Sequence, residues 1–341
     1  MSYIERLRVD GFRNLKGIDI QFAPGMNIVS GPNGAGKSNL LEAIHYLLYL
    51  RSFRNVPDSE LIGDGGDGFS IGGSGGGHQA SVRLHDGTKK VLLNGVKRSR
   101  YSEYAGWLNC VIFSLSDLWL VIGAPSYRRH WLDSLIIRLK PETYRTFLEF
   151  RTVLKQRNQL LIRGGDSPQF EVWTEQLIEI GKRIYQFRGQ IFPEMKAEFN
   201  RIASEIGLEI DITYHPVTTP ETFAADLQKV KTREIELRKT IIGPHRDDII
   251  IAKDGRDIRG YGSTGEQRIG AIILRFVEGN LLKKRGTEPI LLFDEPFIEI
   301  DPNYRERVED FLTGQSIIAT TTELSGEKIF RIERGRIEVA D

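Results

Sequence analysis

The amino-acid sequence predicts an α/β fold, in which a mixed parallel sheet with an antiparallel subdomain is interrupted by an inserted α-helical arm. Three observations support this prediction. A glycine-rich loop at residues 31–38 joins a predicted strand to a predicted helix. A continuous apolar stretch at residues 290–293 is typical of a strand buried in a parallel sheet. Between them, apolar residues recur at helical spacing over residues 173–191.

Composition limits the class of protein before any motif is considered. The chain has 341 residues and a formal net charge of +1, so any binding to nucleic acid must come from local patches. Its single cysteine, Cys110, excludes an intrachain disulfide and a multi-cysteine metal site. The N-terminus has no apolar leader, and no apolar run reaches membrane-spanning length. We therefore expect a cytoplasmic protein with no membrane partner.

Residues 1–140 are predicted to form mixed strands around the glycine-rich loop. Residues 63–77 are dense in glycine and poor in apolar side chains, and we interpret them as a flexible loop. The Asp-Gly pair at 86–87 and the Asn-Gly pair at 94–95 are hairpin turn signals that flank a short strand at 91–93. An antiparallel sheet is therefore expected beside the parallel one.

Residues 141–240 are predicted to form the helical arm. Apolar residues from Trp173 to Ile191 recur at intervals of four and three, which indicates a seam between packed helices. The seam spans only about 30 Å, too short for a long coiled-coil spacer. An earlier helix is expected to end near residues 164–165, and Pro193 is expected to break or bend the second helix.

Residues 241–341 return to alternating strands and helices. We predict strands at 248–252, 290–293 and 316–319, with helices at 266–284 and 303–312. The sheet is therefore expected to be built from both ends of the chain.

The segment GPNGAGKS at residues 31–38 fits the pattern G-x-x-x-x-G-K-[ST], between a predicted strand at 26–30 and a predicted helix at 39–50. Its glycines let backbone N–H groups turn toward a di- or triphosphate. Lys37 is expected to neutralise the β- and γ-phosphates as a catalytic residue, and Ser38 to bind Mg²⁺. The residues expected to contact ATP are Asn33, Gly34, Ala35, Gly36, Lys37, Ser38 and Asn39. A glycine-rich turn with an incidental Lys-Ser pair is the alternative, which the flanking strand and helix disfavour.

The apolar strand at 290–293 ends in two adjacent carboxylates. On a phosphate-loop fold, Asp294 would hold Mg²⁺ through its water shell, and Glu295 would polarise the attacking water as the catalytic carboxylate. A buried strand that ends in acids is common. This pattern therefore indicates a catalytic site only in combination with the phosphate loop.

The segment STGEQ at residues 263–267 follows a glycine-rich turn and opens a predicted helix. The Ser263 hydroxyl, the Gly265 N–H and the helix N-terminus together make an anion site without a basic side chain. The segment resembles the signature motif of ATP-binding-cassette (ABC) ATPases, which reaches across a dimer interface to the γ-phosphate of the partner's ATP. A serine N-cap followed by an acid is the simpler alternative. We favour the signature motif because the segment lies between the phosphate loop and the Asp294 strand, as the cassette order requires.

Two further features fit the cassette order. Asp301 follows the carboxylate strand at the place of the D-loop, which touches the opposite subunit in cassette ATPases. Three threonines, at 320–322, follow the next buried strand, where transporters usually carry a switch histidine. We predict that Thr322 senses the γ-phosphate by hydrogen bonding, and β-propensity alone is an equally good explanation of the three threonines.

Nearly end to end, the chain resembles the RecF family, in the SMC-like branch of the cassette ATPases. The resemblance rests on GFRNL at 11–15, RSFR at 51–54, the run from Arg128-Arg129 to Leu132-Asp133, GPHRDD at 243–248 and the short arm. It implies an ABC-type P-loop ATPase head formed by residues 1–140, with the phosphate loop, and residues 241–341, with the signature motif and carboxylate strand. Residues 141–240 would be the inserted arm. The resemblance also makes Arg13 a candidate nucleotide contact.

The resemblance implies ATP-dependent dimerisation on double-stranded DNA, weak DNA-stimulated ATP hydrolysis, and partnership with RecR, with RecO in the same pathway, in loading the RecA recombinase at gaps. A homodimer also follows physically, because two half-sites that each need the partner's signature motif favour a closed two-fold arrangement. The alternatives are the soluble ATPase subunit of an ABC transporter or another SMC-like ATPase. The missing switch histidine and the GPHRDD segment argue against the transporter.

Basic residues gather in two places, although most such runs are solvated faces, and our hypothesis is that a dimer aligns its two head patches, at residues 89–100, along one DNA groove. The basic residues are Lys89, Lys90, Lys97, Arg98 and Arg100 in the head, and Arg145, Arg151, Lys155, Arg157 and Arg163 in the arm. Within GPHRDD, His245 is expected to make a structural hydrogen bond, and Asp247 and Asp248 are expected to be turn or cap residues.

Overall fold

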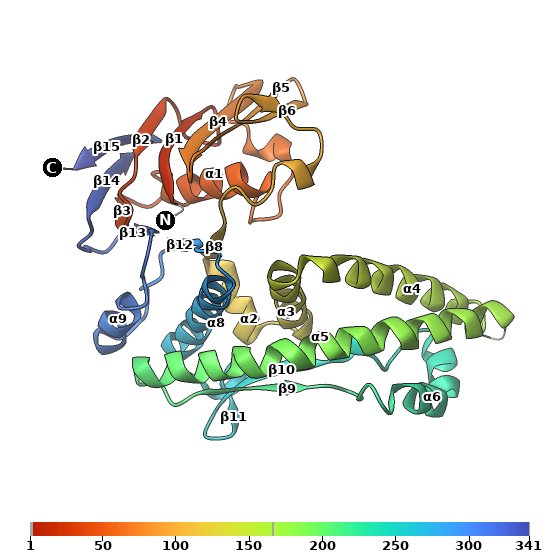
Figure 1. Ribbon diagram of the computed structural model, residues 1–341. Coiled ribbons are helices and arrows are strands. Elements are labelled where there is room, and N and C mark those ends of the chain that lie inside the picture. The colour runs from red at the N-terminus through yellow and green to blue at the C-terminus, as the bar shows by residue number, and fades with distance from the viewer. Residues whose placement is uncertain (1–2, 166, 341) are drawn as a thin grey trace. The chain divides into compact units, whose positions relative to one another are not determined.

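The computed structural model describes residues 3–165 and 167–340 (Figure 1). The chain divides into two compact units. Unit 1 comprises Met1–Asp117 and Glu278–Asp341, and unit 2 comprises Leu118–Val277. The finer division of the sequence into two head segments and an arm, with boundaries after residues 140 and 240, remains a prediction.

Unit 1 contains a six-stranded mixed sheet with the strand order β15-β14-β3-β13-β12-β8. Its strands are β3 (Met26–Ser30), β8 (Cys110–Phe113), β12 (Ile290–Asp294), β13 (Ser316–Thr320), β14 (Lys328–Glu333) and β15 (Arg336–Ala340). Neighbouring strands from β14 to β8 pair in parallel, and β15 pairs antiparallel with β14. The structure thus confirms that strands from both ends of the chain share one sheet.

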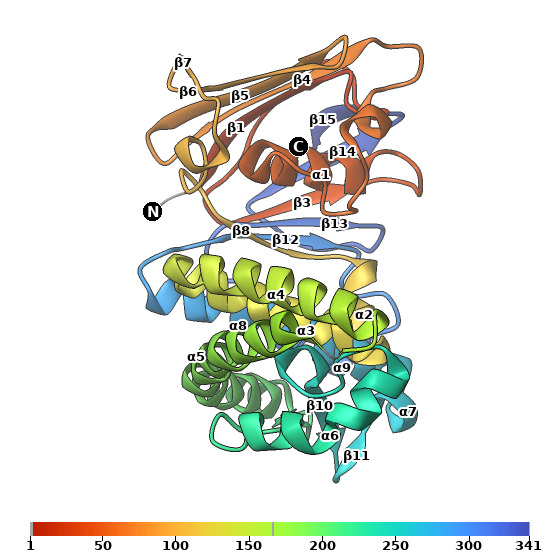
Figure 2. The same cartoon turned by 90° about the vertical axis from the view of Figure 1, so that its right-hand side faces the viewer.

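Helix α1 (Lys37–Tyr49) lies between this sheet and a second sheet of unit 1 (Figure 2). It contacts β12 and β13 on one side and β4 (Gly68–Gly75) on the other. Every side chain from Leu40 to Leu48 is buried. Burial around the whole circumference is expected of a helix that is covered on both sides.

The second sheet of unit 1 is antiparallel, with the strand order β2-β1-β4-β5-β6-β7. In addition to β4, its strands are β1 (Ile4–Asp10), β2 (Ile18–Gln21), β5 (His78–His85), β6 (Thr88–Leu93) and β7 (Val96–Lys97). The turns at residues 86–87 and 94–95 connect β5 to β6 and β6 to β7, which confirms the predicted hairpins.

The prediction of a flexible loop at residues 63–77 is wrong, because β4 occupies most of this segment in the middle of the antiparallel sheet. Its glycines permit close packing. A Cβ at Gly68 would lie 2.0 Å from the backbone oxygen of Leu84, and a Cβ at Gly73 would lie 2.7 Å from Leu47 of α1. The low apolar content therefore reflects the close approach of neighbouring elements, which composition does not reveal.

Unit 2 contains two long helices, α4 (Tyr144–Ile162) and α5 (Pro168–Ile206), which pack side by side as the predicted hairpin (Figure 1). Helix α5 does not end at Pro193, and its 39 residues give a length of about 58 Å. Ile191, Phe192 and Met195 are buried on both sides of the proline. Their packing outweighs the one backbone hydrogen bond that proline removes.

A three-stranded antiparallel sheet and shorter helices complete the fold. In unit 2 these are α2 (Trp119–Ile122), α3 (Pro125–Leu139), β9 (Asp211–His215), α6 (Phe223–Leu237), β10 (Asp248–Lys253), β11 (Arg256–Asp257) and α7 (Ile258–Tyr261). Helix α8 (Thr264–Lys284) begins in unit 2 and continues into unit 1, which also contains α9 (Pro302–Glu309). Short 3₁₀ helices occur at Asp58–Leu61, Tyr101–Glu103, Leu115–Leu118, Pro141–Thr143 and Pro244–Arg246. In the described part of the chain, none of the helices has the length and apolar character needed to cross a bilayer.

We expect Gly68→Ala to destabilise the protein by about 2 kcal/mol, because the added Cβ overlaps backbone atoms of β5 that cannot move without disturbing strand pairing. Gly72→Ala in the same strand is the matched control, since its Cβ would meet no atom closer than 3.8 Å. Urea denaturation of the two variants measures the difference. Equal stability would contradict the close packing of β4.

Candidate functional site

The segment at residues 31–38 forms the predicted loop between β3 and α1. Gly36 caps α1 with a φ of 117°, a conformation that favours glycine, and a Cβ there would lie 2.9 Å from Asn14 Oδ1. Asn33 and Gly34 are exposed at the tip of the loop. The loop therefore offers an exposed rim next to a helix N-terminus, which is a geometry suited to an anion.

Lys37 folds back over this loop from the first turn of α1. Its ammonium donates hydrogen bonds to the carbonyl oxygens of Gly31, at 2.8 Å, and Pro32, at 3.3 Å. The same Nζ lies 3.2 Å from Glu295 Oε1, and the lysine side chain is only 5% exposed. This partly buried ion pair is a contact that an incoming phosphate group could replace.

Ser38 and Asp294 meet although 256 residues separate them in the sequence. The Ser38 hydroxyl donates a 2.8 Å hydrogen bond to Asp294 Oδ1 at the carboxyl end of β12. Burial raises the pKa of Asp294, and the hydrogen bond from Ser38 opposes that rise. Hydroxyl and carboxylate oxygens are ligands that Mg²⁺ prefers, so this pair fits the metal site predicted from the sequence.

Glu295 lies just beyond β12 in the left-handed backbone region, with a φ of 48°. Its N–H donates a 2.8 Å hydrogen bond to the Ala319 carbonyl oxygen, which continues the pairing with β13. Its Oε2 accepts hydrogen bonds from the Thr321 N–H, at 3.0 Å, and the Thr321 hydroxyl, at 3.3 Å. The carboxylate is thus held between Lys37 and Thr321, in an unusual backbone conformation of the kind that gathers at functional sites.

Thr321 is a site residue that the sequence analysis missed. The predicted residue, Thr322, is exposed, and its N–H donates to the Thr320 hydroxyl at 2.9 Å. The run of three threonines after the buried strand indicated that one of them lies at the site. Which threonine meets Glu295 depends on how the chain turns after β13, which ends at Thr320, and the sequence does not reveal that turn. A nucleotide contact by Thr322 is still only a prediction.

Ser263 and Gly265 lie at the start of α8, in unit 2. Ser263 and Glu266 form a capping box, in which Ser263 Oγ accepts from the Glu266 N–H at 3.2 Å and Glu266 Oε2 accepts from the Ser263 N–H at 2.8 Å. Lys253 donates to Glu266 Oε1 at 2.6 Å. The cap that was the simpler alternative is therefore present, and Ser263 is exposed at the N-terminus of a 21-residue helix. Contact of this motif with a nucleotide remains a prediction.

Asp301 and Arg13 are both engaged within unit 1. Asp301 is exposed and caps α9 by accepting a hydrogen bond from the Asn303 N–H at 2.9 Å. Arg13 forms a two-pronged ion pair with Glu42 of α1, with Nε 2.6 Å from Oε2 and Nη2 3.0 Å from Oε1. The roles predicted for Asp301 at a dimer interface and for Arg13 at the nucleotide are proposals that these contacts leave open.

Two of the segments that carry the family resemblance, residues 128–133 and 243–248, contact each other in unit 2. Arg128 Nε lies 2.7 Å from Asp248 Oδ1, and Arg129 donates a 2.6 Å hydrogen bond to the Asp247 carbonyl oxygen. The buried Asp247 carboxylate lies 2.7 Å from Arg188 of α5. The interpretation as a turn or cap residue is confirmed for Asp247, which is the C-cap of the 3₁₀ helix Pro244–Arg246, and is wrong for Asp248, which opens β10. Both carboxylates also neutralise buried arginines.

His245 makes the structural hydrogen bond predicted for it. Its Nε2 lies 3.1 Å from the Thr240 carbonyl oxygen, and its ring centroid is 6.1 Å from that of Phe150. Burial lowers the pKa of His245 to about 4, and the positive charges of Arg246 and Arg129 add to the shift. The imidazole is therefore neutral at pH 7.

The fold and the site together define a phosphate-loop ATPase head. Residues 6–208 match a family model described as an AAA domain. The DNA replication and repair protein RecF of Thermoanaerobacter sp. (strain X514) is 35% identical over 356 residues, with 98% of each chain covered. The protein of the same name from Halalkalibacterium halodurans is 32% identical over 369 residues, covering 98% of this chain and 99% of that protein. A solved structure of the recombination mediator protein RecF-ATP in the RecFOR pathway has a TM-score of 0.84 at 30% identity, covering 100% of this chain and 98% of that one. This chain belongs to the RecF family.

Acid should destabilise the protein through His245. The folded state keeps the imidazole neutral down to about pH 4, whereas the unfolded chain protonates it near its ordinary pKa of 6.5. The unfolded state then binds more protons, so the free energy of unfolding falls as the pH drops through this window, by at most about 3 kcal/mol. We expect His245→Gln, which cannot titrate, to lose less stability than the wild type over the same window in urea denaturation. An identical loss in both proteins would rule out this source of acid sensitivity.

Proposed function

We propose that this protein is an ATP-dependent DNA-binding protein of recombinational repair, whose dimerisation is driven by ATP. The observation that carries the proposal is the gathering, within unit 1, of Lys37, Ser38, Asp294 and Glu295. This set supplies a phosphate-binding ammonium, two oxygen ligands for a metal and a candidate base. The exposed Ser263 at the start of α8 supplies a second anion-binding element on unit 2. Two copies related by a two-fold axis could each complete the other's site.

ATP and Mg²⁺ are the proposed ligands of the unit 1 site. Lys37 would leave Glu295 and bind the β- and γ-phosphates, and Ser38 and Asp294 would hold Mg²⁺. When bound, the metal ion would neutralise phosphate charge. The related structure described as RecF-ATP supports a nucleoside triphosphate as the ligand.

Glu295 is the proposed general base of a weak, DNA-stimulated ATPase. Thr321 holds Oε2, so the departure of Lys37 toward a phosphate would free Oε1 to accept a proton from water. Hydrolysis would be slow because the site is incomplete until Ser263 of a second copy arrives. Bound ATP would thus hold the dimer together, and hydrolysis would release it.

Membership of the RecF family supports a proposal for the DNA and the partner proteins with which this chain acts. We propose that the ATP-bound homodimer binds double-stranded DNA at gaps and acts with RecR, alongside RecO, to load the RecA recombinase. The description of a related solved structure within the RecFOR pathway agrees with this assignment.

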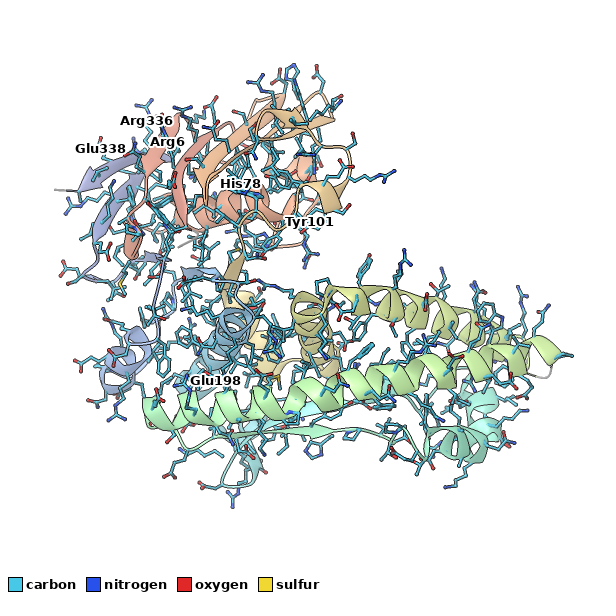
Figure 3. All side chains as sticks on the ribbon, in the orientation of Figure 1. Arg6, His78, Tyr101, Glu198, Arg336 and Glu338 are labelled. Atoms are coloured by element: carbon cyan, nitrogen blue, oxygen red, sulfur yellow. The ribbon has the colours of Figure 1, made fainter. Side chains whose placement is uncertain are left out.

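The structure narrows the set of basic residues that could contact DNA. Arg157 is 1% exposed and pairs with Glu234 inside unit 2, so its assignment as a DNA contact is wrong. Lys89 is engaged by Asp58, with Nζ 2.5 Å from Oδ2. Side chains project from α4 on the side turned away from α5 (Figure 3). The exposed basic residues of α4 are Arg145, Arg151 and Lys155, with Arg163 directly after the helix. We propose this α4 surface as a DNA contact.

Glu295→Gln should bind ATP with nearly unchanged affinity but hydrolyse it about 10²-fold to 10⁴-fold more slowly, because an amide cannot accept the proton. Lys37→Met should lose ATP binding itself, because the ammonium that meets the phosphates is gone. Steady-state phosphate release and titration calorimetry with ATP–Mg²⁺ separate the two effects. Full hydrolysis by Glu295→Gln would contradict the assignment of Glu295 as the base.

Replacing Arg145, Arg151 and Lys155 together by glutamine should weaken binding to double-stranded DNA and reduce the slope of log K against log salt by roughly 2 to 3, the effect of losing three phosphate contacts. The control replaces Lys229, Arg233 and Arg238, three exposed basic residues of α6 and its C-cap, by glutamine. Fluorescence anisotropy over a salt series measures both slopes. Equal slopes for the two triple variants would show that the contact does not lie on α4.

A further inference from the structure

Glu42 is a buried carboxylate on α1, one helical turn beyond Ser38. Its side chain has no exposed surface, yet it meets two guanidinium groups. Besides the two contacts from Arg13, Arg54 Nη1 lies 3.2 Å from Glu42 Oε2, and the Ser52 hydroxyl also donates to Glu42. A buried carboxylate with this set of partners fixes the positions of the segments that carry them.

A chain of side-chain hydrogen bonds runs from Arg54, one of the partners of Glu42, to the phosphate loop. Arg54 Nη1 donates to Asn39 Oδ1 at 3.1 Å, and Asn39 Nδ2 donates to Asn14 Oδ1 at 2.9 Å. Asn14 Nδ2 then donates to the carbonyl oxygens of Gly34, at 3.3 Å, and Ala35, at 3.2 Å. Glu42 is thus connected to the loop backbone without touching it.

The last link of this chain determines how the loop presents its amides. The carbonyl and the N–H of one peptide plane point in opposite directions. The Ala35 carbonyl oxygen is held by Asn14 and also accepts a hydrogen bond from the Gly335 N–H at 2.9 Å. With this carbonyl fixed on one side, the N–H of Gly36 is directed to the other, where it can meet a phosphate.

We propose that Glu42 is a positioning residue for nucleotide binding. It anchors Arg54, and through Asn39 and Asn14 it keeps the phosphate loop in the conformation that accepts the phosphates of ATP. This inference rests on the proposed function of the loop, and it assigns a role to a residue that touches neither phosphate nor metal.

The direction in which the ATP dissociation constant changes on replacing Glu42 tests the proposal. Glu42→Gln removes one negative charge from the surroundings of an anion site, so a purely Coulombic effect would tighten ATP binding. Loss of positioning would weaken it, because Arg54 and the asparagines would no longer be held in place. The two explanations therefore predict opposite changes in the dissociation constant.

The experiment is titration calorimetry of the full chain with ATP–Mg²⁺. We expect about tenfold weaker binding for Glu42→Gln and for Asn14→Ala, the size expected when a hydrogen-bonded connection to the loop is lost. The double variant should be little weaker than either single one, because both changes break the same chain. Asn14→Ala alone tests the final link if Glu42→Gln folds poorly.

Glu234→Gln is the matched control. Glu234 is equally buried, and its Oε2 lies 2.6 Å from Arg157 Nη2 in unit 2, remote in sequence from the phosphate loop. It should lose stability to a comparable degree while its ATP dissociation constant stays at the wild-type value. Unchanged or tighter binding by Glu42→Gln, or fully additive effects in the double variant, would overturn the proposal. Absence of ATP binding by the wild type would instead refute the proposed function, and this inference with it.

Discussion

The parallel pairing of β13 with both β3 and β12 is the constraint on which the candidate site depends. β3 leads into the phosphate loop, β12 ends in Asp294, and β13 lies between them in register. Parallel strands end at the same edge of a sheet, and ligands of open α/β sheets bind at that edge. The 2.8 Å contact between Ser38 and Asp294 is the direct result, although the two residues come from opposite parts of the chain. Without β13, neither the proposed metal site nor the carboxylate beside Lys37 would form.

Two kinds of interaction hold this edge ready for a ligand. The Lys37–Glu295 ion pair neutralises the buried Lys37 ammonium and the partly buried Glu295 carboxylate, which would be costly if left alone. Hydrogen bonds from the uncharged donors Asn14 and Thr321 hold the loop carbonyls and the Glu295 carboxylate. The ion pair is the part that a phosphate could exchange, because Lys37 gains a stronger anion and Glu295 is released for chemistry. The hydrogen bonds from Asn14 and Thr321 need not change, so the loop can keep its shape while the charges rearrange.

The sequence predicted most of the elements that surround the site, because each had a strong local signal. The phosphate loop has a fixed pattern, β12 and β13 are continuous apolar runs, and the hairpins carry Asp-Gly and Asn-Gly turns. Errors arose where tertiary packing overrides local preference. The glycines of β4 resemble a loop in the sequence, but Leu84 and Leu47 pack directly against them. Pro193 is tolerated within α5 because the residues around it are buried.

The other site features that the sequence did not predict depend on contacts between residues that are distant in the sequence. Glu42 has the appearance of an ordinary helical glutamate, and only the folded chain brings Arg13 and Arg54 to it. Likewise, a run of three threonines does not reveal that Thr321 meets Glu295. For Ser263, the sequence offered both a helix cap and an anion site. The cap is present, and the two roles are compatible because the capping serine remains exposed.

The central claim is that each ATP site is completed by a second copy of the chain, and a mixing experiment tests it most directly. Lys37→Met lacks a working phosphate loop, and Ser263→Arg blocks the signature motif, so each variant should be inactive as an ATPase by itself. An equimolar mixture would contain heterodimers with one intact composite site, and its activity should rise to about a quarter of the wild-type value. Activity no greater than the sum of the two separate variants would contradict the composite site and leave a phosphate loop that acts alone.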